Sequence, residues 1–146
     1  MNKAVKAYGA DILGSDRFLK AYRVKHHLKH NVAEHSLRVA ESGYRMARWL
    51  NEHGIDVSCE DVVRGGLLHD IGMTERGVHE SASYKKAFLH PQSSGDIAGA
   101  EYCANDVQLD AIRRHMWPIC VIPPKHLAGW VIVAADKYSS VKEFLI

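Results

Sequence analysis

Six histidine and aspartate side chains stand at positions where burial in a folded domain is expected. They are His35, His69, Asp70, His90, His115 and Asp136. A buried polar group must find a partner, and imidazole and carboxylate groups can satisfy one another by converging on a cation. The chain contains ten histidines, and histidine is the commonest metal ligand in proteins. These residue types therefore favour a metal site, provided that the fold brings them together.

The first of these side chains, His35, lies in a stretch with helical periodicity. Between Val32 and Leu50, apolar residues recur at steps of three and four, which is the period of one helix face, and His35 shares that face. Asn31 is placed to cap this helix and Gly54 to end it. We therefore expect His35 to point into the core of a helical domain.

The neighbouring residues His69 and Asp70 are expected at the end of a second helix. Ser58 followed by Asp61 resembles a capping box, which predicts that this helix starts there. Gly72 is a stop signal shortly after the apolar run. Both side chains are thus predicted to lie where a buried helix ends.

Residues 72–90 form a polar stretch without a clear period, so we expect a long loop, with one short helix around residues 84–88. Loops of this length in compact domains are often functional. His90 and Pro91 then indicate an N-cap followed by proline in the first helical turn, starting a helix that runs to about Ala104.

The last two candidates, His115 and Asp136, are also expected on helices. Asn105 caps a helix that His115 ends, and Pro124 indicates the first turn of a helix that runs almost to the last residue. Residues 130–135 are a short β-branched run that is also compatible with a buried strand. Pro124 and the lack of a second convincing strand favour the helix.

These patterns predict an all-α protein, a compact single-domain bundle of about five or six helices. The longest apolar stretch, residues 127–135, is too short to span a bilayer, and we see no signal peptide. The three scattered cysteines, Cys59, Cys103 and Cys120, indicate reduced thiols rather than disulfides, and therefore a cytoplasmic location.

We expect one domain over residues 1–146, with a basic, helical N-terminal segment over 1–30 and the metal-binding core over 31–146. The segment holds seven Lys and Arg against two Asp, whereas the net charge of the whole chain is only +2. A solvated helix face is favoured over a basic binding arm, and no nucleic acid is expected. The sequence KHHLKH at residues 25–30 could bind adventitious metal, but a solvated basic face is the preferred interpretation.

The order and context of the six side chains resemble the HD superfamily of metal-dependent phosphohydrolases over about residues 31–143. The motifs that carry the resemblance are EHSLRVA, LLHDIGM, HPQSSGDIAG, RRHMWP and VAADKYSS. The resemblance implies the HD-type helical bundle and a first metal held by His35, His69, Asp70 and Asp136. His90 and His115 match the two extra histidines of dinuclear members, in which the HD aspartate, here Asp70, bridges both ions.

Four imidazoles and two carboxylates form a borderline N/O ligand set that suits Mn, Fe, Co, Ni or Zn and is poor for Ca. Two ions about 3.5–4 Å apart can share a water and lower its pKa from 15.7 toward about 7, which supplies hydroxide at neutral pH. The ions also neutralise charge that develops on a phosphoryl oxygen.

Two basic residues are candidates for catalysis beside Asp70. Arg38 follows His35 by one turn and could reach a phosphate, although an interhelix salt bridge is an equally good interpretation. Lys137 matches the DK pair common in the family and either projects past the metals or faces water.

The predicted function is hydrolysis of a phosphate ester, either a monoester or a diester. The substrate would be a nucleotide or another small phosphorylated metabolite. Met73 stands where many cyclic-dinucleotide phosphodiesterases of the family have lysine, and the GYP signature is missing, so a cyclic dinucleotide is not expected. Two alternatives remain: a mixed-valent di-iron oxygenase with the same ligands, and a non-catalytic module that binds metal or nucleotide. We expect a small-molecule substrate and no membrane partner, and the sequence does not indicate an oligomeric state.

Overall fold

The computed structural model describes residues 1–27, 29–75 and 84–145, with residues 27 and 84–88 described by their backbone only. The helices are α1 (Lys3–Tyr8), α2 (Ala10–Leu13), α3 (Asp16–Ala21), α4 (Val32–Glu52), α5 (Cys59–Leu68), η1 (Ile71–Glu75, a 3-10 helix), α6 (Tyr84–Glu101), α7 (Asp106–Arg114) and α8 (Leu127–Leu145). Two short strands, β1 (Lys25–His27) and β2 (His30–Asn31), form an antiparallel pair. The all-α prediction is confirmed.

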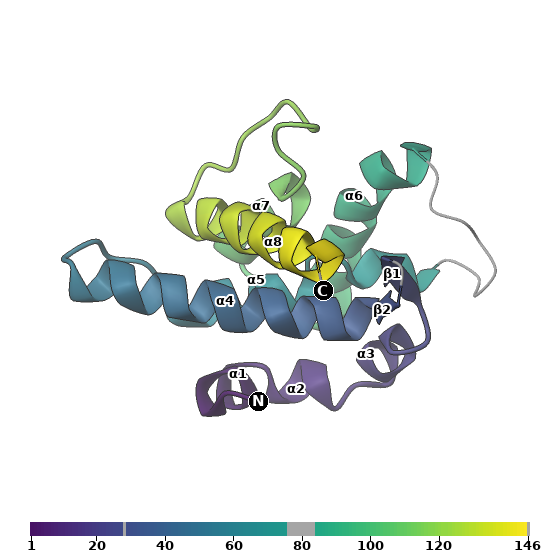
Figure 1. Ribbon diagram of the computed structural model, residues 1–146, viewed down its shortest axis with the longest axis horizontal. Coiled ribbons are helices and arrows are strands. Elements are labelled where there is room, and N and C mark those ends of the chain that lie inside the picture. The colour runs from purple at the N-terminus through teal and green to yellow at the C-terminus, as the bar shows by residue number, and fades with distance from the viewer. Residues whose placement is uncertain (28, 76–83, 146) are drawn as a thin grey trace.

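The longest helix, α4, is the element on which the others assemble (Figure 1). Helix α8 lies along it and runs in the opposite direction, so the C-terminal end of α8 lies near the start of α4. Helix α5 packs on α4 as well, and Gly66 permits this close approach because a Cβ there would lie only 3.0 Å from the Cα of Ala40. Helix α7 packs on both α5 and α8.

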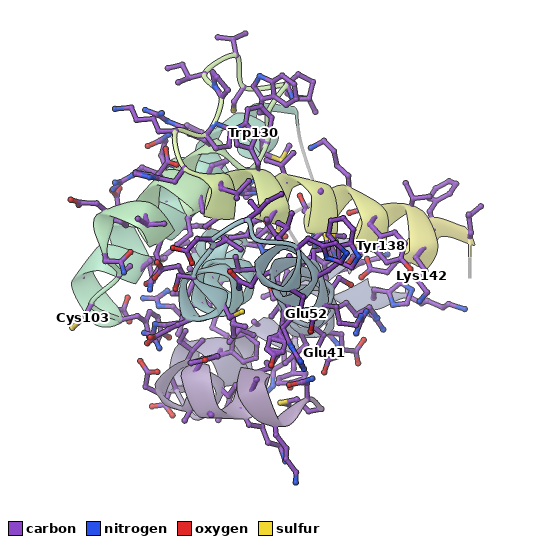
Figure 2. All side chains as sticks on the ribbon, turned by 90° about the vertical axis from the view of Figure 1, so that its left-hand side faces the viewer. Glu41, Glu52, Cys103, Trp130, Tyr138 and Lys142 are labelled. Carbon is purple, nitrogen blue, oxygen red and sulfur yellow. The ribbon has the colours of Figure 1, made fainter. Side chains whose placement is uncertain are left out.

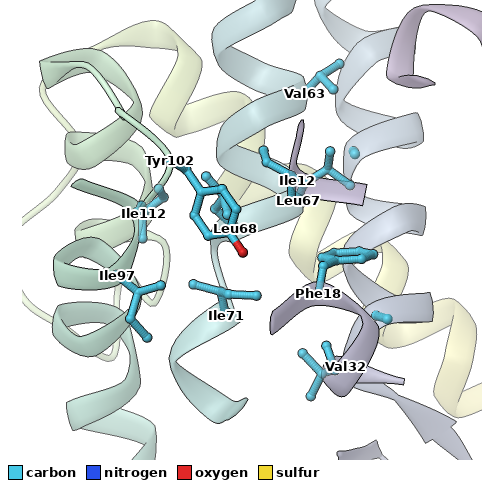
Figure 3. Close-up of a cluster of buried hydrophobic side chains, with 14 of the residues drawn as sticks. Ile12, Phe18, Val32, Val63, Leu67, Leu68, Ile71, Ile97, Tyr102 and Ile112 are labelled. Atoms are coloured by element: carbon cyan, nitrogen blue, oxygen red, sulfur yellow. The ribbon is translucent and has the colours of Figure 1, made fainter. Parts of the chain in front are cut away.

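Buried apolar side chains from helices far apart in the sequence form the main core (Figure 3). Phe18 of α3 is 1% exposed and belongs to the same cluster as Leu67 of α5, Ile112 of α7 and Ile71 of η1. At about 25 cal/mol for each Å² of apolar surface removed from water, burial of such side chains is the main stabilising contribution. Two members of this core, Leu68 and Ile71, flank His69 and Asp70 in the sequence.

Three capping predictions are confirmed. The side chain of Asn31 accepts a hydrogen bond from the amide of Glu34, and Ser58 and Asn105 cap α5 and α7 in the same way. Gly54 follows the end of α4 with φ of +81°, a backbone conformation that suits glycine. Side-chain caps satisfy helix N–H groups locally, which is why these helix starts could be predicted from sequence.

The predicted start of the helix at His90 is wrong, because α6 already begins at Tyr84 and Pro91 lies inside it. A proline inside a helix removes one amide donor and crowds the preceding turn, a cost that the packing of α6 against η1 and α7 offsets. The expectation of a short helix around residues 84–88 is met by the first turns of α6. Residues 72–75 of the predicted loop instead form part of the 3-10 helix η1, and residues 76–83 lie outside the described residues.

Two residues that were predicted to mark a helix end or a helix start lie elsewhere. Gly72 lies within η1 rather than at a helix stop. A Cβ at this position would lie only 2.7 Å from the amide nitrogen of Ser94. Pro124 precedes α8, which starts at Leu127, and packs against Gly129 instead of occupying the first turn. The ambiguous residues 130–135 are helical, as favoured.

The segment that precedes α4 is not a helix throughout. Residues 3–21 form the three short helices α1 to α3, whereas KHHLKH contains the strands β1 and β2 instead of a solvated helix face. The N-terminal helices are held by Arg64 of α5, whose guanidinium donates to the carboxylate of Asp11 and to the backbone carbonyls of Tyr8 and Tyr102. In the part of the chain described here, no helix is both long and apolar enough to cross a membrane.

Candidate metal centre

The fold brings the six predicted side chains to one place. His35 is on the first turn of α4, His69 caps the C-terminal end of α5 and Asp70 follows it. His90 lies within α6, His115 caps the C-terminal end of α7, and Asp136 is in the middle of α8. All six residues are buried, with relative exposures from 0% for His35 to 9% for Asp136.

Asp70 lies between two groups of imidazoles, and its Oδ2 faces the first group. This oxygen is 3.1 Å from Nε2 of His69 and 3.7 Å from Nε2 of His35. The carboxylate of Asp136 completes this side, with Oδ1 at 2.9 Å from Nε2 of His35 and 3.5 Å from Nε2 of His69. Two imidazole nitrogens and two carboxylates thus surround one small volume.

The other oxygen of Asp70, Oδ1, faces the second group. It lies 3.0 Å from Nε2 of His90 and 3.4 Å from Nε2 of His115. The two ring nitrogens are 3.1 Å from each other. The two oxygens of a single carboxylate therefore address different pairs of imidazoles, as a carboxylate placed between two cations would.

The outward-facing nitrogens of three histidines have fixed partners. Nδ1 of His69 donates to the carbonyl of Gly66 at 2.6 Å, and Nδ1 of His115 donates to the carbonyl of Ile112 at 2.7 Å. Nδ1 of His35 lies 3.0 Å from both oxygens of Glu143. In metal sites the nitrogen that does not bind the ion makes such a bond, which fixes the tautomer and the orientation of the ring.

These outer bonds test whether the donor set fits a cation. A carbonyl only accepts hydrogen bonds, so Nδ1 of His69 carries a proton, and Nε2 presents a lone pair toward the site whenever the ring is neutral. That Nε2 is buried, faces the carboxylate of Asp70 and has no hydrogen-bond partner within the described part of the chain. Burial lowers the pKa of His69, but Asp70 and Asp136 outweigh burial and raise this pKa well above its usual value, so a proton on Nε2 can supply the positive charge that this site needs, and a metal ion that binds there would take its place.

The acidity of the cluster points the same way. Burial raises the pKa of Asp70 and of Asp136, but the surrounding histidines lower both values more, so both pKa values lie well below the usual range. Burial lowers the pKa of His35, whereas hydrogen bonds to Asp136 and Glu143 raise it, with a net result of about 9. Two ionised carboxylates in a nearly dry site thus require positive charge close by.

His26 belongs to the cluster, contrary to the predicted solvated face. Its side chain is 6% exposed, and its Nε2 lies 2.9 Å from Oδ2 of Asp70. The error came from treating KHHLKH as a helix, whereas in β1 successive side chains point to opposite sides. The buried Val24, the exposed Lys25 and the nearly buried His26 show this two-residue alternation, which was the available signal.

Glu143 is the other residue that sequence reasoning missed. It follows Asp136 by seven residues, which places it two turns later on the same face of α8, and it is 4% exposed. Burial raises the pKa of Glu143, but His35 and Arg38 lower it more, so the net pKa lies below its usual value. A carboxylate at this helical spacing was a detectable candidate for the outer bond to His35.

The two predicted basic residues lie apart from the cluster's interior. Arg38 is 40% exposed and donates to Oε1 of Glu143 at 3.1 Å, which is the interhelix salt bridge considered as its alternative. Lys137 is exposed, because neighbouring residues in a helix point about 100° apart and Asp136 faces inward. A catalytic role for Lys137 stays a prediction.

Arg38 also lines a cavity of about 370 Å³ between α4 and α8. Its other lining residues are His30, Glu41, Ser42, Arg45, Tyr138, Ser139, Lys142 and Glu143. Figure 2 shows Glu41 on α4 with Tyr138 and Lys142 on α8 at this side of the molecule. The cavity shares Glu143 with the histidine cluster and has three cationic side chains in its wall.

The similarity of this chain to known proteins identifies its family. A family model described as the HD domain matches residues 32–140. The chain is also similar to an uncharacterized protein of Methanocaldococcus jannaschii, with 50% identity over 42 residues, and this match covers 29% of the chain and 25% of that protein. No solved structure matched the chain. The HD model spans most of the chain and contains all six predicted residues, so the chain belongs to the HD domain family.

Proposed function

We propose that this protein is a metal-dependent phosphohydrolase that hydrolyses a phosphate ester of a nucleotide or another small phosphorylated metabolite. The observation that carries the proposal is the position of Asp70, whose Oδ2 faces His69 and His35 while its Oδ1 faces His90 and His115. One carboxylate between two groups of imidazoles is the arrangement expected of a ligand shared by two ions.

The six buried residues would hold the ions, two for each chain. The first would be held by His35, His69, Asp70 and Asp136, and the second by Asp70, His90 and His115. When bound, divalent cations such as Mn, Fe, Co, Ni or Zn supply an activated water and neutralise charge on the phosphoryl group.

The protein's own contribution is to hold the inner groups rigidly and exclude bulk water. The carbonyls of Gly66 and Ile112 keep the Nε2 atoms of His69 and His115 directed inward. Glu143 does the same for His35. Because these partners belong to helices or follow helix ends packed on a buried core, little reorganisation is needed during the reaction.

The cavity between α4 and α8 is our proposed position for an anionic part of the substrate. Arg38, Arg45 and Lys142 place three cations in its wall, against the carboxylates of Glu41 and Glu143. Glu143 already pairs with Arg38 and His35, so the charge of Arg45 and Lys142 is available to an anion. A substrate with a phosphate or carboxylate beyond the reacting group would use this wall.

Metal analysis and a phosphate-release screen test the proposal together. Purified protein is analysed for bound metal and then assayed with nucleotides, sugar phosphates and phosphodiesters, with Mn²⁺ or Co²⁺, with and without O₂. We expect about two ions for each chain and metal-dependent release of phosphate or a phosphomonoester that needs no O₂.

The variants Asp70→Ala and His115→Ala extend the test. Loss of Asp70 is expected to abolish metal uptake and turnover, whereas loss of His115 is expected to empty mainly the second site. A folded Asp70→Ala protein with full turnover would overturn the proposal, and turnover that needs O₂ would replace it with the oxygenase alternative.

A further inference from the structure

We propose that His26 is an additional protein ligand of the metal centre, supplied by the strand pair in front of α4. The inference rests on the proposed function, because it assumes that the cluster binds metal. It goes beyond the six residues of the family pattern, since the HD domain match begins at residue 32 and His26 lies before it.

The position of the imidazole carries the inference. Nε2 of His26 lies 2.9 Å from Oδ2 of Asp70, closer than Nε2 of either His35 or His69 to the same oxygen. His26, His35 and Asp70 each offer a ligand atom within 4.8 Å of the other two. The nitrogen of His26 thus lies on the side of Asp70 where the first ion would be held.

The ring of His26 is oriented by its neighbours. It stacks on the ring of His35 with a centroid distance of 3.9 Å and an interplanar angle of 15°. Both rings present Nε2 toward the carboxylate of Asp70, at 2.9 and 3.7 Å. The stack holds His26 beside His35, but two parallel rings cannot both lie in plane with one ion, so His26 would have to turn out of the stack to bind the cation that His35 binds.

The backbone holds this arrangement in place. In the strand pair, Lys25 lies opposite Asn31 and His27 lies opposite His30. The amide of Val32 donates to the carbonyl of Val24 at 2.8 Å, which ties the strand pair to the first turn of α4. His26 is therefore positioned by the same element that positions His35.

The chemistry of the site gains from a fifth donor. With His26, the first ion would have three imidazoles and two carboxylates, a richer nitrogen set that suits Fe, Co, Ni or Zn better than Mg or Ca. The second ion would keep three protein donors and more open positions. The two ions would then differ, with the first bound more tightly and the second available to the substrate.

A glutamine substitution separates a ligand from a hydrogen-bond partner. In His26→Gln the side-chain amide can still donate to Asp70, but an amide is a much poorer ligand for Co²⁺ or Zn²⁺ than an imidazole. The measurements are the Zn²⁺ dissociation constant by chelator competition, the number of ions for each chain and the visible absorption spectrum with Co²⁺. The matched control is His30→Gln, which changes the same strand pair without touching Asp70.

If His26 binds the metal, His26→Gln weakens Zn²⁺ binding at the tighter site at least about tenfold, the smaller end of the effect of removing even an outer partner of a ligand. The Co²⁺ spectrum of this variant also changes, and that of His30→Gln does not. Wild-type affinity and spectrum in folded His26→Gln would overturn the inference and leave the proposed function intact. Wild-type protein that binds no metal would overturn both.

A folding defect is resolved by a second substitution. His26→Asp restores a ligand of different charge, so it is expected to recover much of the Zn²⁺ affinity and to show a third Co²⁺ spectrum. A folded His26→Asp protein with the wild-type Co²⁺ spectrum would assign His26 a purely structural part and refute the inference.

Discussion

Replacing Glu143 by glutamine is expected to weaken metal binding although Glu143 is not among the proposed ligands. Both of its oxygens lie 3.0 Å from Nδ1 of His35, and Oε1 also accepts from Arg38 at 3.1 Å. The residue is only 4% exposed, so water does not replace these bonds readily. Removing the charge leaves His35 less basic and less firmly oriented toward the ion.

The magnitude follows from two independent considerations. Hydrogen bonds to charged groups contribute about 1.5–3 kcal/mol. Loss of the outer partner of a metal-binding histidine costs about 10- to 100-fold in affinity, which is about 1.4–2.7 kcal/mol at 1.36 kcal/mol for each factor of ten. Because the two ranges overlap, we expect the Zn²⁺ dissociation constant to rise by one to two orders of magnitude.

Chelator competition at fixed pH and ionic strength measures this constant for the wild type, Glu143→Gln and Glu41→Gln. Glu41 is the matched control, because it lines the same cavity but its side chain bonds to the amide of Asn2 at 3.3 Å rather than to His35. Circular dichroism of the metal-free proteins establishes that each is folded. A dissociation constant for Glu143→Gln within twofold of the wild type would refute the reasoning that this carboxylate tunes His35.

Four further changes have defined outcomes. Arg64→Ala removes the bonds that hold α1 and α2 against α5, so its free energy of unfolding in urea is expected to fall by about 1–3 kcal/mol. The control is Arg48→Ala, which removes an exposed i,i+4 ion pair with Glu52 and is expected to cost under about 1 kcal/mol. Equal losses in the two variants would contradict the role of Arg64 in docking these helices. Gly66→Ala places a Cβ 3.0 Å from the backbone of Ala40, and overpacking of about 1–3 kcal/mol is expected in the same assay, whereas an unchanged midpoint would show that α4 and α5 separate freely. Arg45→Ala is expected to raise the KM for a substrate with a second anionic group while leaving kcat nearly unchanged; a fall in kcat alone would place the cavity elsewhere in the mechanism. Removal of metal with a chelator is expected to lower the Tm measured by calorimetry, because an ion that binds only the folded state stabilises it by mass action, and an unchanged Tm would argue against a bound ion.

The helical scaffold was predictable because its signals are local. Asn31, Ser58 and Asn105 accept hydrogen bonds from amides only three residues away, and apolar periodicity marks the faces of α4 and α7. The start of α6 was not predictable by the same rules. Pro91 favours the first turn of a helix in general, but α6 starts earlier, at Tyr84, so that Pro91 lies inside it.

The six central residues could be selected from sequence because each is a polar group at a buried position of a helix or at its end. Their pairing could not be selected in this way, since the division of His69 and His35 from His90 and His115 depends on which oxygen of Asp70 each ring faces. That division is a property of helix packing angles, which no spacing along the chain encodes.

The residues that were missed explain what sequence patterns leave out of a site such as this one. His26 lies before the family match and Glu143 lies after it, and both contact His35. They meet there because α8 runs antiparallel to α4, so its C-terminal end returns to the strand pair at the start of α4 (Figure 1). This closure depends on segments that lie outside residues 32–140, the part of the chain that the family model matches. If His26 and Glu143 set the affinity of the first ion, the metal preference of this protein is determined by the flanking elements rather than by the shared HD motif.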